Sequence, residues 1–199
     1  MNYVEKIKEK AIQNNGLITR KEIISLKIPP IYITRMVRKK ELEKIDIGIY
    51  ALTSLDNYPY DPEFNFCSRY QVPVFSYVYA LNLFDFTDII PLNFEVTVYK
   101  GYNAQNLKPN TIVHYVNKDI FDLGITEIRN AFGNLVRTYD IERTICDLIK
   151  NRKNIDVELF VKTMNNYVDY EKKDWNKLYE YAEKMHIQKE LVEIFQLII

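Results

Sequence analysis

The order of local patterns near the N-terminus restricts the fold of this chain more than any other feature. Apolar residues recur at helical spacing over residues 3–14. Thr19, with Glu22 three residues on, has the pattern of a capping box at the start of a second helix over 20–26. A proline pair follows, and because proline suits the first turn of a helix, a third helix is expected over about 30–40. The sequence thus predicts three short helices in close succession.

Two alternating segments follow the third predicted helix, over residues 42–46 and 49–52. Ile47 and Gly48 lie between them, which is typical of a β-hairpin. A hairpin directly after two helices joined by a tight turn predicts a winged helix-turn-helix over residues 1–55. A three-helix module that binds protein is the alternative interpretation of the same pattern.

The apolar positions give the second and third helices a buried and an exposed face. The residues expected to face inward are Ile23, Ile24 and Leu26 from the second helix and Ile33, Met36 and Val37 from the third. The remaining side chains include basic, aromatic and hydroxyl groups, which are the types that contact bases and phosphates. The candidate DNA-binding residues are Thr19, Arg20, Tyr32, Thr34, Arg35, Arg38, Lys39 and Lys44. We expect the first part of the third helix to approach base edges and its end, with Lys44, to approach phosphates.

The charge is divided unevenly along a chain whose net charge is zero. Residues 1–55 hold 11 lysines and arginines against 6 acidic residues, a net charge of +5, and residues 56–199 hold 16 against 21, a net charge of −5. A basic segment joined to an acidic one indicates that the first meets a polyanion and the second does not. A chance division of the charges is the alternative.

The stretch GLITRKEIISLKIPPIYITRMVRKKELEKIDIGIYAL resembles the winged-helix segment of AbiEi-type antitoxins from type IV toxin–antitoxin, or abortive-infection, systems. In that family the helix-turn-helix ends in a pattern close to R-L-V-x-x-G-x-L-x-R-x-x-x-G-x-Y. The residues that fall on this pattern are Arg35, Met36, Val37, Leu42, Lys44, Gly48 and Tyr50. Lys40 replaces the family's glycine, so the third helix is expected to run longer or to end differently.

A turn-rich segment, residues 56–62, is the predicted linker to a second domain over residues 63–199. The segment 75–84 is apolar enough for a buried helix, and several alternating segments predict strands. The expected strands are 94–99, 112–116, 125–129 and 134–138, and the expected C-terminal helices are 155–168, 174–185 and 187–198. The fold class is therefore α/β (α+β): a winged helix-turn-helix followed by a mixed α/β domain that ends in helices.

The segment DIERTICDL, which starts at Asp140, resembles the D-x-E-R-T-x-x-D-L signature of the same antitoxins. Asp140 can cap the helix that follows, and Arg143 and Asp147 stand four residues apart, the spacing of a helical ion pair. One interpretation is a cap and an ion pair on an exposed face that orient the helix. The other is a part of the antitoxic surface, made by Asp140, Glu142, Arg143, Thr144 and Asp147.

No motif for nucleotide hydrolysis, dinucleotide binding or metalloprotease chemistry occurs, so we expect neither an enzyme nor a cofactor or metal site. His114 and His186 are isolated and are interpreted as structural or surface residues. Glu95 and Lys100 lie on opposite faces of one predicted strand, which argues against the carboxylate–lysine pair of a nuclease. Two unmatched cysteines and a charged N-terminus without an apolar core predict a cytoplasmic protein.

The resemblance implies a function that composition alone does not give. The protein would be a type IV antitoxin that also represses its own operon by binding inverted repeats in the promoter. Its counterpart would be a toxin resembling nucleotidyltransferases, neutralised without a stable complex. The protein could be a monomer in solution, with two copies on the operator. The alternatives are a plain winged-helix regulator whose C-terminal domain senses a ligand, and a degenerate nuclease with a DNA-binding head.

Overall fold

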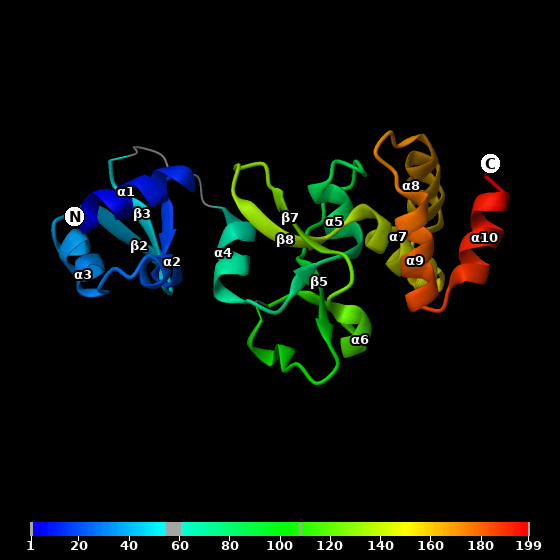
Figure 1. Cartoon of the computed structure of the whole chain (residues 1–199), viewed down its shortest axis with the longest axis horizontal. Helices are drawn as coiled ribbons and strands as arrows, with labels where there is room; N and C mark the ends of the chain where they lie inside the picture. Colours follow the sequence, from blue (N-terminus) through cyan, green and yellow to red (C-terminus); the bar gives the residue numbers. More distant parts are fainter. Residues whose placement is uncertain (1, 55–60, 108, 199) are drawn as a thin grey trace. The chain divides into compact units, whose positions relative to one another are not determined.

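The computed structural model describes residues 2–54, 61–107 and 109–198 (Figure 1). The chain forms two compact units, Met1–Gln71 with Arg129–Val136 and Val72–Ile128 with Arg137–Ile199. The predicted linker over 56–62 lies largely outside the described residues. The division into domains at 1–55 and 63–199 stays a prediction about independent folding.

The first unit has the predicted order of elements up to residue 52, followed by a helix over residues 62–69 that the sequence pattern did not predict. Its helices and strands are α1 (Tyr3–Gln13), β1 (Leu17–Thr19), α2 (Arg20–Ser25), α3 (Ile31–Arg38), β2 (Leu42–Asp46), β3 (Ile49–Leu52) and α4 (Pro62–Arg69). The strands form an antiparallel sheet in the order β1-β3-β2. We call β2, β3 and the turn at residues 47–48 the wing. The helix-turn-helix and hairpin expected from the sequence are therefore present.

The capping box at the start of α2 is confirmed. Thr19 Oγ1 accepts a hydrogen bond from the backbone N–H of Glu22 at 3.1 Å, and Glu22 Oε2 accepts one from the N–H of Thr19 at 2.8 Å. The expectation that α2 buries three residues is wrong, because Ile23 is buried but Ile24 and Leu26 are exposed. A helix of six residues makes fewer than two turns, so only one of its apolar side chains faces the core.

The end of α3 shows how the chain accommodates Lys40, the residue at which the sequence predicts a longer or different helix end. Lys40 takes a left-handed conformation, with φ of 56°. Its N–H donates to Val37 O at 3.0 Å, and the N–H of Glu41 donates to Met36 O at 2.9 Å. These two bonds are those of a Schellman motif, which normally ends a helix on glycine. The expectation of a longer helix is wrong: α3 ends at Arg38 in the usual geometry, with a lysine in the strained position.

The first unit extends past the wing into α4. Phe64 of α4 packs with Leu17 and Ala51 of the small sheet. Asp61, which caps α4, is buried and accepts hydrogen bonds from the side-chain amides of Asn130 and Asn134. These contacts explain why the unit reaches Gln71 and includes the turn between two distant strands.

The second unit is built on a five-stranded mixed sheet in the order β6-β5-β4-β8-β7. Its strands are β4 (Val74–Phe75), β5 (Glu95–Tyr99), β6 (Ile112–Val116), β7 (Ile125–Arg129) and β8 (Leu135–Tyr139), and its first helices are α5 (Tyr77–Leu83) and α6 (Lys118–Phe121). The four predicted strands are confirmed. The predicted helix over 75–84 is shorter than expected, since Phe75 belongs to the central strand β4 and pairs with β5 and β8.

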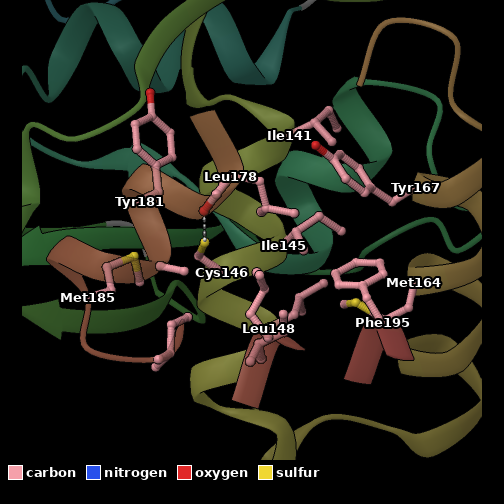
Figure 2. Packing of buried hydrophobic residues seen from close by; sticks show 14 of the residues in the cluster. Ile141, Ile145, Cys146, Leu148, Met164, Tyr167, Leu178, Tyr181, Met185 and Phe195 are labelled. Carbon is pink, nitrogen blue, oxygen red and sulfur yellow. Dashed lines mark hydrogen bonds between the residues drawn. The ribbon is translucent and has the colours of Figure 1, made fainter. Parts of the chain in front are cut away.

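Helix α7 (Ile141–Lys150) forms the centre of the helical part. It packs against α8 (Val157–Asp169), α9 (Trp175–Lys184) and α10 (Gln188–Gln196) around a single apolar cluster (Figure 2). Ile145 and Leu148 lie at the centre of this cluster, and Cys146 Sγ donates to the backbone oxygen of Leu178 at 3.7 Å. The mixed α/β fold with a helical C-terminal segment is therefore confirmed. Among the described residues, no helix has the length and apolar character that crossing a bilayer requires.

Candidate nucleic-acid interface

The outer face of α3 collects polar and basic side chains. Burial of Ile33 and Met36 in the core of the first unit fixes the rotation of this helix. The side chains on its other face are consequently exposed, and we call the set Thr34, Arg35, Arg38 and Lys39 the α3 surface. The sequence predicts that these four residues and Tyr32 face outward, which is confirmed for the four and wrong for Tyr32, whose ring is half-buried against the core.

Arg35 is held in place by an aromatic ring rather than by an acid. Its guanidinium lies 5.4 Å from the centre of the Tyr32 ring. The Tyr32 ring in turn packs edge-on against Tyr3 of α1, with 5.1 Å between the ring centres. Tyr32 is therefore half-buried and supports Arg35, whose charge stays available at the surface.

Acidic residues of the first unit pair with lysines away from the α3 surface. Glu41 lies 3.3 Å from Lys8, and Glu22 lies 3.8 Å from Lys10. Within the described part of the chain, no ion pair involves the basic residues of the α3 surface or Lys44 of β2. The positive charge of this unit is thus left uncompensated where a helix-turn-helix meets DNA.

Two predicted DNA contacts differ in their surroundings. Thr19 is buried and its hydroxyl is bonded to Glu22, so it acts as a helix cap and is not part of the exposed face. Arg20 is exposed at the first position of α2, and its N–H donates to Gly48 O at 2.7 Å. This bond ties the tip of the wing to the start of the helix-turn-helix.

Two exposed residues beside the α3 surface were not singled out from the sequence. Lys40 follows α3 and adds a positive charge next to Lys39, and Ile47 is an exposed apolar residue at the tip of the wing. The replacement of the expected glycine by a cationic residue was the available signal for Lys40. For Ile47, the signal was an apolar residue in a tight turn, where polar residues are usual.

The sequence of the first unit matches a known protein family. Residues 5–53 match the family described as "Transcriptional regulator, AbiEi antitoxin". The AbiEi resemblance is confirmed for this segment. The match supports a role of the chain as an antitoxin or transcriptional regulator, with DNA and a toxin as partners of such proteins in general, and the family is generally non-enzymatic.

One solved structure has a similar fold over most of the chain. It is the crystal structure of the RV2827C protein from Mycobacterium tuberculosis, with a TM-score of 0.54 and 10% sequence identity. The similarity covers 94% of this chain and 76% of that protein. At this level of identity it shows a shared fold alone. A search of curated proteins finds no match.

Polar residues of α7 and of its N-cap form a largely buried network, which we call the α7 network: Asp140, Glu142, Arg143, Thr144 and Asp147. Arg143 Nε lies 3.1 and 3.2 Å from the two carboxylate oxygens of Asp147. Its Nη1 donates to the backbone oxygens of Ile120 and Leu123, both at 2.6 Å. Burial is the largest single influence on the pKa of the Arg143 guanidinium and lowers it, but Asp147 and Tyr139 together raise the pKa above its ordinary value, so the guanidinium stays charged.

The other members of the α7 network fasten the start of the helix. Asp140 Oδ1 accepts from the N–H of Arg143 at 2.8 Å, as predicted for a cap. Asp140 and Glu142 both pair with Lys177 of α9, at 2.9 and 3.4 Å. Thr144 Oγ1 donates to Asp140 O at 2.8 Å. The expectation of an ion pair on an exposed face is wrong, because every residue from Ile141 to Ile149 is buried and α7 packs against α5 and α8–α10.

A second polar cluster surrounds the start of α5. Tyr77 has a φ of 52°, which is unusual for a bulky side chain, and its ring stacks on that of His114 with centres 3.8 Å apart. His114 Nε2 lies 2.8 Å from Glu95 Oε1, and Glu95 Oε2 accepts from the N–H of Val78 at 3.1 Å. The interpretation of His114 as a structural residue agrees with these contacts, which hold the strained β4–α5 junction in place.

The described residues contain no group of three or more His, Cys, Asp or Glu side chains arranged to hold a metal ion. His186 is exposed at the end of α9.

Proposed function

We propose that this protein is the antitoxin of a type IV toxin–antitoxin system and represses its own promoter. The observation that carries the proposal is the coincidence of the family match at residues 5–53 with an exposed basic helix face that forms no ion pair with the described residues. A helix surface of this kind suits a ligand that supplies regularly spaced negative charges, as DNA does.

On the operator, α3 would enter the major groove. Arg35, held by Tyr32, is the residue best suited to contact a guanine edge through two parallel hydrogen bonds. Arg38, Lys39 and Lys44 would contact phosphates, and the wing would fix the angle of the unit on the duplex. Two copies on inverted repeats would give each half-site the same contacts.

The second unit would neutralise a toxin resembling nucleotidyltransferases, without a stable complex. The burial of the α7 network supports an indirect role for it in antitoxicity, through the fold that it maintains. The surface that acts against the toxin would then lie elsewhere on this unit.

The experiment measures repression and rescue in the same strain. The full-length protein should repress a reporter driven by its own promoter and restore growth to cells that express the toxin gene of the same operon. The triple variant Arg35→Ala, Arg38→Ala and Lys39→Ala should lose repression and keep rescue, because the three side chains are exposed and leave the core intact.

The matched control removes three positive charges from the second unit, with Lys172→Ala, Lys184→Ala and Lys189→Ala. All three lysines are exposed, and this variant should repress and rescue like the wild type. Repression without any rescue by the wild type would contradict the antitoxin assignment and favour a plain regulator. Metal-dependent cleavage of the operator would favour the nuclease.

A further inference from the structure

A pocket of about 460 Å³ lies where the C-terminal end of α7 meets the turn between α9 and α10. Residues 149–154 form one wall, and His186, Ile187 and Glu190 form the other. Two buried apolar side chains, Ile149 and Ile187, lie at its base. Its volume is in the range of small-molecule sites and is large enough for a nucleotide-sized compound.

The charge of this pocket is opposite to that of its surroundings. Lys150, Arg152 and Lys153 line it, against one carboxylate, Glu190. The segment 56–199 as a whole has a net charge of −5. Among the described residues, none of these four side chains takes part in an ion pair. Three cations around one concavity repel each other, and a bound anion would relieve that repulsion.

One of the three basic residues has a structural role at a helix end, whereas the other two have none that the described contacts show. Lys150 Nζ donates to Met185 O at 3.1 Å, so this lysine stabilises the carbonyl end of α9. Arg152 and Lys153 lie beyond α7 in the single 3₁₀ turn Arg152–Asn154, and both side chains are exposed. Helix α10 starts at the same pocket, and no side chain caps it at Ile187. Its free N–H groups add to the positive potential there.

We propose that this pocket binds a phosphorylated small molecule of about nucleotide size. The phosphate lies against Arg152 and Lys153, and the apolar part of the ligand lies against Ile149 and Ile187. Glu190 accepts a hydrogen bond from a hydroxyl or amino group of the ligand, which separates a nucleotide or sugar phosphate from free phosphate. This site is independent of the α3 surface, and it gives the second unit a ligand of its own.

Calorimetric titration of the full-length protein with inorganic pyrophosphate and with ADP tests the proposal. Both probes should bind, and the variant Arg152→Ser with Lys153→Ser should bind each at least about tenfold more weakly. The matched control, Lys172→Ser with Lys184→Ser, removes the same charge from exposed positions outside the pocket and should bind like the wild type. Glu190→Leu, which removes the accepting oxygens, should weaken ADP binding without weakening pyrophosphate binding.

Several outcomes would overturn this assignment. One is the absence of binding by either probe at millimolar concentration. Another is an equal loss in the pocket variant and in the control, since that would mean unspecific attraction. A third outcome is measured with the triple variant Arg35→Ala, Arg38→Ala and Lys39→Ala, which lacks the proposed DNA contacts. If a random DNA duplex displaces ADP from this variant, the pocket is a nucleic-acid surface. Thermal unfolding of each variant without a probe checks that the fold is kept.

Discussion

Helices α3 and α7 are both amphipathic and both carry arginine, but the arginines of α3 are exposed and the arginine of α7 is buried. In α3 the guanidiniums are exposed, and no acidic partner of theirs is found among the described residues. Arg143 of α7 is wholly buried, and its Nε and Nη1 are bonded to Asp147 and to two backbone oxygens. A buried charge held by such bonds contributes to the fold, whereas an exposed charge is available to a ligand. The same residue type thus has two roles, which accessibility and partners decide.

The largest effect is expected from removing Arg143. Arg143→Ala would leave Asp147 as a buried, unpaired carboxylate and would deprive two carbonyls of their donor. We expect the unit that contains α7 to lose about 3–5 kcal/mol of unfolding free energy, measured by urea denaturation.

The control for this prediction is another ion pair with the same spacing. Lys184 and Glu180 also stand four residues apart, but their side chains are 52% and 57% exposed, against 0% and 3% for Arg143 and Asp147. Lys184→Ala should cost no more than about 0.5 kcal/mol. If the two substitutions lower the unfolding free energy by similar amounts, burial does not explain the different roles of the arginines in α7 and α3.

On the exposed side of the comparison, Arg35→Ala should weaken operator binding by about 1–3 kcal/mol and leave stability unchanged. Arg38→Ala and Lys39→Ala should each weaken binding to operator and random DNA alike, and should reduce the salt dependence by about one unit per lost phosphate contact. Filter binding at several salt concentrations measures both effects. Equal losses on the two DNAs for Arg35→Ala would remove it from direct base contact.

Apart from the phosphate contact of Lys44, the wing should position the α3 surface on DNA rather than contact bases. Gly48 has a φ of 75°, a conformation that β-branched residues avoid, although a side chain would have room, with Arg20 Cβ at 3.8 Å. Gly48→Val should therefore destabilise the first unit by about 1–3 kcal/mol and reduce repression of the promoter, while toxin rescue is kept. Wild-type repression by this variant would show that the wing is dispensable.

The smallest expected effect is at the end of α3, where a substitution should raise stability rather than lower it. Lys40 occupies a left-handed position that glycine adopts without strain. Lys40→Gly should stabilise the first unit by about 0.5–1 kcal/mol, as a shift of the thermal midpoint to higher temperature. Lys39→Gly, one residue earlier and with φ of −80°, should destabilise it instead. A gain from both substitutions would refute the explanation by backbone strain.

Local patterns were sufficient for the first unit because its elements are short and carry their own signals. The capping box at Thr19 and the turn at Gly48 each depend on residues a few positions apart, so they can be recognised in the sequence. The outward direction of Arg35 followed from helical spacing alone. The exposure of Ile24 could not be predicted in this way, because it depends on how short α2 is and on which of its faces meets α1.

In the second unit the sequence determined four of the five strands, the C-terminal helices and the cap at Asp140, since these follow from periodicity and from neighbouring residues. It missed the two-residue central strand β4, which is too short to show an alternating pattern. Only the tertiary structure decided that every residue of α7 from Ile141 to Ile149 is buried. Two partners of Arg143, Ile120 and Leu123, lie 23 and 20 positions before it in the chain. The partners of Glu142 come from α8 and α9. A helix with charged residues along one face has the same sequence pattern whether that face is exposed to water or covered by segments distant in the chain, because long-range packing has no local sequence signal. For the same reason, the pocket at the end of α7 exists only once two segments that are distant in the sequence, residues 149–154 and 186–190, meet.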